Sequence, residues 1–319
     1  MIQAQNVQQQ PSQDVREQLY SQLEDYMGLS STKKKMDSSE KSGGTTLKRK
    51  SSEQSSSSSS SKALSKNTLA IKVNGKTIKG SAQNIVGRVV EAEMGASFRE
   101  EALKAQAVAA YTYIRYNNQK GTIPSLPAKS SVSAKVEDAV EQVIGEALYY
   151  QGEYINATYC ASNAGNSVDS ENVWGGYLPY LRSVESPGDT TLKAYGAVKR
   201  FSEEEIAQYI EENLDVDPYD YSDPDEWFED EEYINGRYVD SIRVCGKRLS
   251  GREVREELME FALPSAAFEV EYDDGEFIFT TYGYGHGVGM SQQGADYFAQ
   301  RGWDYEEILT HYYTGVTLK

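Results

Sequence analysis

The sequence predicts an α+β fold in which helices and antiparallel strands surround a substrate cleft. The pair Asn74-Gly75 lies between two short alternating segments, a pattern typical of a β-hairpin. Further strand patterns return between residues 239 and 282, and helix patterns follow them. One helical face is marked by four residues that recur at i, i+3, i+4 and i+7, namely Val86, Val89, Val90 and Glu93.

The first 66 of the 319 residues differ from the rest in composition. They are rich in Gln, Ser and Lys and end in the serine run Ser55–Ser61. Such a segment cannot bury enough apolar surface to offset its ordering entropy. We therefore expect a disordered stalk or linker over residues 1–66. A folded domain is expected over residues 67–319, with an acidic insertion at 203–232.

The folded region is expected to begin with a strand over residues 69–73 that turns into a second short strand. The helix ending at Glu93 follows. Next comes Ser97-Phe98-Arg99-Glu100, which has the form of a capping box: the Ser side chain accepts an unpaired N–H, and Glu100 reaches back. This box predicts the start of an alanine-rich helix through residues 101–114.

The middle of the chain contains a hairpin over residues 147–159 and then a small-residue loop, Tyr159–Ser167. The loop either lets backbone approach a ligand or forms a tight connection. The aromatic cluster from Trp174 to Tyr180, which includes Tyr177, is consistent with a sugar-stacking wall or with ordinary core. The remaining expected elements are helices over 137–145, 203–214, 251–259, 291–299 and 305–313, and strands over 239–244, 268–272 and 277–282.

The charge excludes one class of partner. The net charge is −17, and residues 67–319 carry 22 basic against 42 acidic residues. Nucleic acid requires a basic surface, so we expect no nucleic-acid partner. Residues 203–232 hold 15 Asp and Glu and no Lys or Arg. Their spacing does not match an EF-hand, which favours a solvated acidic segment over a calcium loop.

The two cysteines, Cys160 and Cys245, form neither a metal-type pair nor a disulfide framework; they either bridge the fold or stay free. The sequence contains no apolar run long enough to span a membrane. The segment Met1–Gln10 lacks the basic and apolar regions of a signal peptide. Taken alone, these features indicate a soluble intracellular chain.

Glu93 is the candidate catalytic residue. It lies in the apolar stripe of its helix, whereas Glu91 points to the polar side. A carboxyl held on a core-facing stripe is expensive to ionise, so it keeps its proton or finds a partner. A general acid that works near neutral pH needs this environment. The alternative is a buried glutamate that is paired for structure alone, and periodicity by itself favours that alternative.

A second unusual stretch surrounds His286, which is flanked by four alternating glycines at residues 283–289. Its glycines allow close backbone approach, but no Lys follows in the spacing of a phosphate loop. The chain has only two histidines, so a His-rich zinc site is excluded. A mixed site that uses Cys160, His286 or His311 is a weak alternative, and we expect neither metal nor cofactor.

Several stretches together resemble the stage II sporulation protein D family, also called the SpoIID/LytB domain. They occur in the family's order and span roughly residues 69–319. They are Val89-Val90-Glu91-Ala92-Glu93-Met94, Glu101–Ala110, Val173-Trp174-Gly175, Pro179-Tyr180-Leu181, Leu249-Ser250-Gly251-Arg252, Gly285–Gln292 and Ile308–Tyr313.

The resemblance implies a peptidoglycan lytic transglycosylase that acts on glycan strands stripped of stem peptides. It identifies Glu93 as the catalytic acid. It also implies a location outside the cell membrane during sporulation, glycan strands as substrate, and a cell-wall amidase of the engulfment machinery as a partner. Together with the local patterns it gives eight candidate substrate-binding residues, which are Gln106, Tyr111, Arg115, Ser162, Asn163, His286, Ser291 and Gln292.

The chain departs from the family pattern at three places. Tyr111 stands where an Arg is common, so a substrate-side cation is missing or supplied by Arg115. Gly95 replaces the usual Pro, and residues 117–131 lack the Cys and His with which some members bind zinc. Since no export signal is present, we expect the chain to begin inside a longer protein. A glycan-binding modifier of an amidase and a spore-coat structural protein are the alternative functions.

Overall fold

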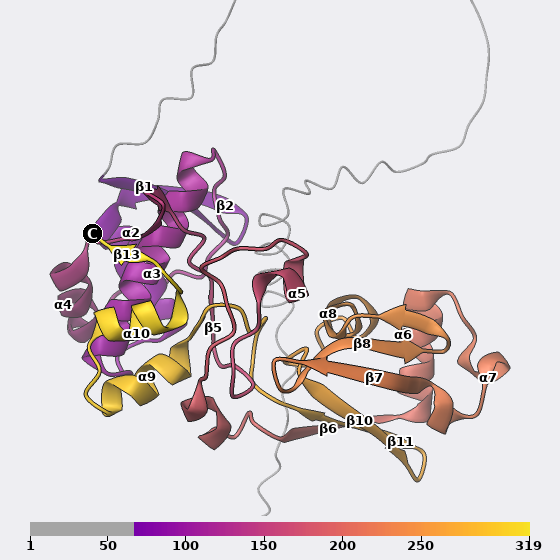
Figure 1. Ribbon diagram of the computed structural model, residues 1–319. Coiled ribbons are helices and arrows are strands. Elements are labelled where there is room, and N and C mark those ends of the chain that lie inside the picture. Colours follow the sequence, from indigo (N-terminus) through magenta and orange to yellow (C-terminus); the bar gives the residue numbers. More distant parts are fainter. Residues whose placement is uncertain (1–66) are drawn as a thin grey trace, which may run out of the picture.

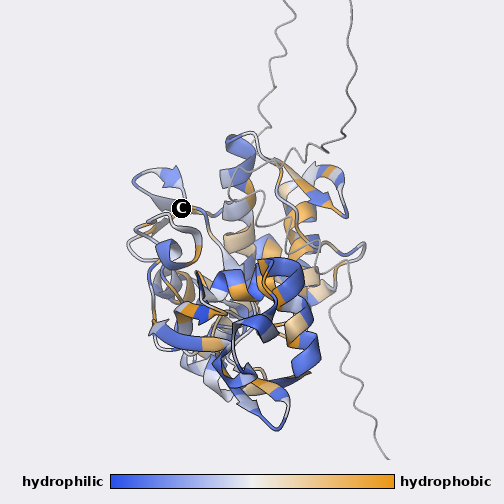
Figure 2. Ribbon diagram, turned by 90° about the vertical axis from the view of Figure 1, so that its right-hand side faces the viewer, coloured by the Kyte–Doolittle hydropathy of each residue, from blue (hydrophilic) through white to orange (hydrophobic). Residues whose placement is uncertain are grey.

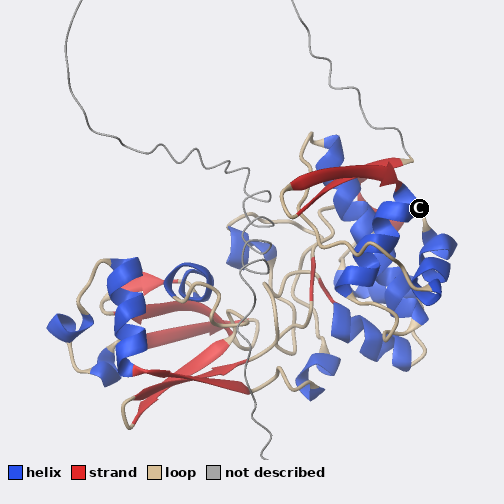
Figure 3. Ribbon diagram, turned by 180° about the vertical axis from the view of Figure 1, so that it is seen from behind, coloured by secondary structure: helices blue, strands red, loops and turns tan. Residues whose placement is uncertain are grey.

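The computed structural model describes residues 67–319, so the expected disordered segment 1–66 lies outside the described residues. The described chain forms two lobes, with extended segments between them (Figure 1). Each lobe has its own buried apolar cluster. Helices dominate one lobe and strands the other (Figure 3). The predicted α+β fold is therefore confirmed.

The helical lobe is built from the two ends of the described chain. Its central helix, α3, packs against α2, α4, α9 and α10. The expected hairpin at Asn74-Gly75 is present, and both turn residues have positive φ. The elements of this lobe are β1 (Thr68–Val73), β2 (Lys76–Ser81), α2 (Ala82–Glu93), α3 (Glu100–Gln119), α4 (Ala134–Val143), β3 (Leu148–Tyr150), β4 (Glu153–Tyr154), α9 (Gln292–Gln300), α10 (Tyr305–Tyr312) and β13 (Thr317–Leu318).

The strand-rich lobe is formed by residues 197–281. Its two antiparallel sheets have the strand orders β10-β11-β6 and β7-β8-β9. The helix expected at 251–259 is a short α-helix followed by a π-helical turn. The elements are β6 (Ala197–Ser202), α6 (Glu203–Leu214), α7 (Pro218–Tyr221), η2 (Pro224–Glu226), β7 (Phe228–Ile234), β8 (Tyr238–Val244), β9 (Lys247–Leu249), α8 (Gly251–Glu253), η3 (Val254–Leu258), β10 (Phe268–Asp273) and β11 (Glu276–Thr281).

The acidic stretch at residues 203–232 contributes to the core of the strand-rich lobe. It forms α6, α7 and most of β7, and it buries Ile206, Ile210 and Trp227. Its carboxylates lie mainly on the outer faces of these elements, where side chains are exposed or half-buried. Polar and apolar residues alternate around the helices (Figure 2), as expected for elements that cover a core on one side.

Four short elements connect the lobes: β5 (Tyr159–Cys160), α5 (Ser170–Trp174), η1 (Pro187–Thr191) and β12 (Met290–Ser291). Strands β5 and β12 pair in parallel, Met290 with Tyr159 and Ser291 with Cys160. We call this pair, together with loops 161–169 and 282–289, the seam. The seam brings the small-residue loop and the His286 loop side by side, although they are more than 100 residues apart in sequence.

Candidate active site

Glu93 is the last residue of α2, as the helical pattern predicts. Val86, Val89 and Val90 are fully buried, so the stripe faces the core. The helix ends because the N–H groups of Met94 and Gly95 both donate to the Val90 carbonyl, and Gly95 takes a φ of 72°. Such a φ favours glycine, and proline, whose φ is fixed near −65°, cannot adopt it.

The predicted capping box at Ser97 is wrong. Helix α3 begins at Glu100, and its N-cap is Arg99 without a side-chain cap. The Arg99 N–H instead donates to the Asp296 carboxylate of α9 (2.7 Å), and the Arg99 guanidinium forms an ion pair with the same carboxylate. A tertiary contact therefore replaces the local cap and ties the turn after Glu93 to α9.

The Glu93 carboxyl meets the amide of Gln292, the first residue of α9. Gln292 Nε2 donates to Glu93 Oε2 over 3.1 Å. Burial raises the pKa of Glu93 from 4.5 to about 7, and the Gln292 hydrogen bond partly opposes that rise. Two of the sequence-predicted site residues, 199 positions apart, are thus in direct contact. A glutamic acid with this pKa is half-protonated near neutral pH.

The neighbouring carboxylate, Glu91, has a different environment. Its Oε2 accepts hydrogen bonds from the backbone N–H of Ser133 (3.0 Å) and from the Ser133 hydroxyl (2.6 Å). Ser133 precedes α4, so Glu91 fastens α4 to α2. The two glutamates thus face different surroundings, as the helical periodicity predicted, whereas the catalytic role of Glu93 stays a prediction.

Tyr159 is a site residue that the sequence did not reveal. Its hydroxyl is buried. The pKa of this hydroxyl is raised by burial, by the Glu93 charge and by neighbouring tyrosines. Gln106 of α3 lies beside it and is fully buried. The Gln106 amide faces the Tyr159 hydroxyl closely enough to oppose part of that rise in pKa, but among the described residues neither group has a hydrogen bond of ordinary geometry. Buried polar groups are normally paired, so these two groups have hydrogen-bonding capacity that the protein itself does not fill.

The His286 ring is held as a neutral imidazole. Its Nδ1 accepts the Val288 N–H (3.0 Å), which places the proton on Nε2. Burial and the nearby Arg255 charge lower its pKa to about 4, although a hydrogen bond to the Tyr159 backbone opposes this. The ring also packs on Trp174, with centroids 5.1 Å apart. These contacts match the loop-bracing role, and a role in substrate positioning stays a prediction.

The small-residue loop is fixed from several sides. The Cys160 thiol donates to Asn163 Oδ1 (3.0 Å), and burial raises its pKa to about 12. Ser162 and Tyr284 exchange backbone hydrogen bonds of 3.1 and 2.9 Å across the seam. The Asn163 N–H donates to the buried Asp189 carboxylate (2.9 Å), another residue that the sequence did not reveal. Both cysteines are free, which resolves the alternative that the sequence left open.

Tyr111 and Arg115 form an internal pair on α3. Arg115 Nε donates to the Tyr111 hydroxyl (3.0 Å), and the guanidinium lies over the Tyr111 ring. A further contact leads from Arg115 to the Thr68 carbonyl (3.5 Å), toward β1. Both side chains are buried. Their substrate-binding role stays a prediction that these contacts do not support.

The aromatic cluster after the small-residue loop divides into three environments. Tyr180 is buried and its hydroxyl accepts the Asn156 N–H, so it belongs to the core. Trp174 lies at the end of α5 against His286. Tyr177 is 65% exposed, with the Arg182 guanidinium 4.4 Å from its ring centre. Tyr180 therefore matches the core alternative, and sugar stacking by Tyr177 stays a prediction.

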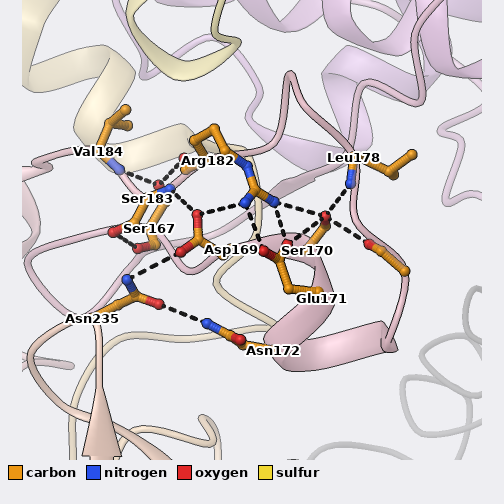
Figure 4. Close-up of polar contacts among 11 residues, drawn as sticks. Ser167, Asp169, Ser170, Glu171, Asn172, Leu178, Arg182, Ser183, Val184 and Asn235 are labelled. Atoms are coloured by element: carbon orange, nitrogen blue, oxygen red, sulfur yellow. Dashed lines mark hydrogen bonds and ion pairs between the residues drawn. The ribbon is translucent and has the colours of Figure 1, made fainter.

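Arg182 organises the polar network around α5 (Figure 4). Its guanidinium forms ion pairs with Glu171 and with Asp169 (3.4 Å) and a hydrogen bond to Ser170 (3.1 Å). Ser170 Oγ in turn accepts the Leu178 N–H (2.9 Å). This network fixes the loop that presents Trp174 and Tyr177.

Residues 67–319 contain no group of three or more His, Cys, Asp or Glu arranged to hold a metal ion. A cavity of about 250 Å³ lies between the start of α2 and α4, lined by Ser81, Asn84 and Glu137 among others. It does not include Glu93, so the predicted cleft at Glu93 stays a prediction. None of the described helices has the length and apolarity needed to cross a membrane.

Comparison with known proteins places this arrangement in a family. The family model described as stage II sporulation protein matches residues 77–152, which include Glu93. The chain is similar to the stage II sporulation protein D of Bacillus amyloliquefaciens, with 33% identity over 76% of this chain and 77% of that protein. Its similarity to the Bacillus subtilis protein of the same name is 32% identity over the same shares. An amidase enhancer of Bacillus subtilis is 27% identical over 72% of this chain and 39% of that protein.

Proposed function

The chain belongs to the stage II sporulation protein D family, and we propose that it is a lytic transglycosylase. Its substrate would be peptidoglycan glycan strands that lack stem peptides, and its products would carry 1,6-anhydromuramic ends. The observation that supports this most is the Glu93 carboxyl, whose pKa burial raises to about 7 where Gln292 contacts it. An acid with that pKa can both give and take a proton near neutral pH.

The reaction needs one carboxyl in two successive roles. Protonated Glu93 gives its proton to the glycosidic oxygen as the bond from that oxygen to C1 of muramic acid breaks. The Glu93 carboxylate then takes the proton of the C6 hydroxyl, whose oxygen forms a bond to C1. No water is consumed, and Glu93 ends protonated as it began.

The surroundings of Glu93 favour this route over hydrolysis. Glycoside hydrolases ordinarily use two carboxyl groups, about 5–9.5 Å apart. The pKa of Glu93 is set by burial and by Gln292, without a charged partner. The nearest carboxylate in sequence, Glu91, is already bound to Ser133. The buried amide of Gln106 and hydroxyl of Tyr159 would bind sugar hydroxyls next to the acid.

The family suggests where the enzyme acts. We propose that it works on the wall outside the cell membrane during sporulation, alongside a cell-wall amidase that removes stem peptides first. A second candidate function, a non-catalytic modifier of an amidase, is favoured by the similarity to an amidase enhancer. A binding module does not require a carboxyl with a pKa suited to acid catalysis, so the raised pKa of Glu93 favours the enzyme.

Digestion of stem-peptide-free glycan strands tests the proposal, with products read by mass spectrometry. We expect anhydro-ended fragments from the parent protein and a loss of about 10²–10⁴-fold in rate for Glu93→Gln. Glu91→Gln is the matched control, because it lies two residues earlier on the same helix and its amide oxygen can still accept from Ser133.

The other outcomes separate the alternatives. Reducing ends from the parent would indicate hydrolysis and contradict the single-carboxyl mechanism. Strand binding without cleavage by either protein, together with stimulation of an added wall amidase, would establish the modifier instead. Equal loss in the Glu91→Gln and Glu93→Gln variants would show that α2 is merely sensitive to substitution.

A further inference from the structure

Asp189 is a buried carboxylate on which three distant segments of the chain meet. It is 1% exposed and lies in η1, between the lobes. Its Oδ2 accepts from the Asn163 N–H (2.9 Å) and from the Ser186 hydroxyl (2.7 Å). Its Oδ1 accepts from the Ser291 hydroxyl (2.8 Å). One side chain therefore ties the small-residue loop to the beginning of α9.

The Ser291 contact leads directly to Glu93. Ser291 is the N-cap of α9, and its Oγ accepts the Gly294 N–H (2.9 Å) while its hydroxyl donates to Asp189. The next residue, Gln292, donates its side-chain amide to Glu93 (3.1 Å). The chain of contacts thus runs from Asp189 through the helix cap to the proposed catalytic acid.

The surroundings leave little room for another arrangement. The Ser186 hydroxyl, besides donating to Asp189, is 2.6 Å from the Tyr312 hydroxyl of α10. A Cβ on Gly294 would come within 2.0 Å of that Tyr312 hydroxyl and 2.4 Å of Ser186 Oγ. The start of α9 is therefore in direct contact with η1 and α10, and Asp189 accepts a hydrogen bond from its capping serine.

We propose that Asp189 is a positioning residue for Glu93: through Ser291 it fixes where α9 begins, so that the Gln292 amide meets the Glu93 carboxyl. Asp189 itself does not touch Glu93 or the reacting atoms. The importance of Asp189 for catalysis rests on the proposed function. Its control over the Glu93–Gln292 contact is independent of that function.

This role has a consequence that can be measured without substrate. The Gln292 hydrogen bond favours the ionised form of Glu93 and so lowers its pKa. If Asp189 holds that bond in place, removal of either Asp189 or its link to Ser291 releases the bond, and the pKa of Glu93 rises further. Tyr159 faces Glu93, and Cys160, Tyr238 and Tyr312 lie near Asp189; these side chains are neutral near pH 7 because burial raises the pKa of each. Burial also raises the pKa of Asp189 to about 6, so Asp189 is mostly ionised at the Glu93 midpoint, and the Arg255 charge acts on Cys160 and Tyr238.

The experiment is a ¹³C NMR titration of glutamate side-chain carboxyls in the full chain, with the Glu93 signal assigned by its loss in Glu93→Gln. We compare the parent with Asp189→Asn, Ser291→Ala and Gln292→Ala. The expected midpoint is about 7 in the parent and higher by about one pH unit in all three variants, because each releases the Gln292–Glu93 hydrogen bond. Asp189→Asn does so because an amide has one acceptor oxygen for the three donors that the two carboxylate oxygens serve. The double variant Asp189→Asn/Gln292→Ala should match Gln292→Ala alone.

Ser202→Ala is the matched control. Ser202 caps α6 with the same kind of hydrogen bond, to the Glu205 N–H (3.2 Å), but it lies in the strand-rich lobe. Its removal should leave the Glu93 midpoint unchanged. If Asp189→Asn fails to fold, Ser291→Ala carries the test, because it leaves the Asn163 and Ser186 contacts in place.

Two results would overturn the proposal. One is a Glu93 midpoint that rises in Gln292→Ala but not in Asp189→Asn or Ser291→Ala. The other is a midpoint that does not move in Gln292→Ala. If the midpoints shift as expected but glycan strands are not cleaved, the positioning role stands and the proposed function fails.

Discussion

The two cores of the molecule differ in what they bury. The strand-rich lobe encloses aromatic side chains: Trp227 stacks on Phe277, and Phe228 contacts Phe279. The helical lobe and the seam instead contain Glu93, an acid whose pKa is raised to about 7. They also contain the Gln106 amide and the Tyr159 hydroxyl, which lack hydrogen bonds of ordinary geometry. Unpaired buried polar groups reduce stability, and proteins retain them chiefly where they serve a function. This difference favours the helical lobe and the seam as the place of the proposed chemistry, with the strand-rich lobe as support.

The largest expected contrast is between two buried or half-buried glutamates. Glu93→Gln should lower the rate of strand cleavage by about 10²–10⁴-fold and leave the fold intact. Glu256→Gln should instead destabilise the fold and leave cleavage per folded molecule unchanged. Glu256 forms ion pairs with Arg252 (2.9 Å) and with the buried Arg255 (3.4 Å). Breaking a buried ion pair costs about 3–5 kcal/mol of unfolding free energy. Urea unfolding and cleavage per folded molecule measure the two effects. If Glu256→Gln lost more cleavage activity than its unfolded fraction explains, the strand-rich lobe would have a role in catalysis beyond support.

A pair of glycines gives the next contrast. Both Gly289 in the seam and Gly275 in the strand-rich lobe have φ near 80°. A Cβ on Gly289 would lie 2.2 Å from the Thr158 carbonyl oxygen, whereas one on Gly275 would meet nothing within 4 Å. Gly275→Ala should therefore cost only the strain of a left-handed residue, about 1–2 kcal/mol. Gly289→Ala should cost clearly more, and should also reduce cleavage. Equal losses in thermal unfolding would show that the seam tolerates movement.

The smallest effect is a dependence of stability on pH. Because the pKa of Glu93 is raised from 4.5 to about 7 on folding, the folded state binds this proton more tightly than the unfolded state does. Its contribution is neutral below about pH 4.5, becomes increasingly unfavourable between pH 4.5 and 7, and stays constant above that range. Glu93→Gln should therefore unfold at a higher temperature than the parent at pH 8, with a difference that shrinks toward pH 4.5. Glu91→Gln is the control, and a difference that is constant with pH would contradict the raised pKa.

Local sequence patterns were sufficient to predict the helix that carries Glu93 and the hairpin before it. The apolar stripe predicted α2 and the inward direction of Glu93, and the Asn74-Gly75 signal predicted the first hairpin. The helix at 203–214 was also predicted with its observed bounds. These features depend on residues close in sequence, where periodicity and turn chemistry are decisive.

The rest of the site depends on contacts between distant segments. Nothing near Asp189 in the sequence indicates that it accepts from residues 26 and 102 positions away. Likewise, the Ser97 capping box was outcompeted by the tertiary contact of Arg99 with Asp296. Tyr159 reads locally as a strand residue, and only the β5–β12 pairing brings it beside Glu93. Such contacts follow from the fold and leave no local signature.

The pH dependence of kcat/KM on stem-peptide-free strands tests the acid role of Glu93 most directly. If protonated Glu93 starts the reaction, kcat/KM should fall as pH rises through about 7, the pKa that burial gives this carboxyl. Products should keep anhydro ends throughout that range. A value of kcat/KM that stays flat or increases between pH 6 and 8 would contradict Glu93 as the acid.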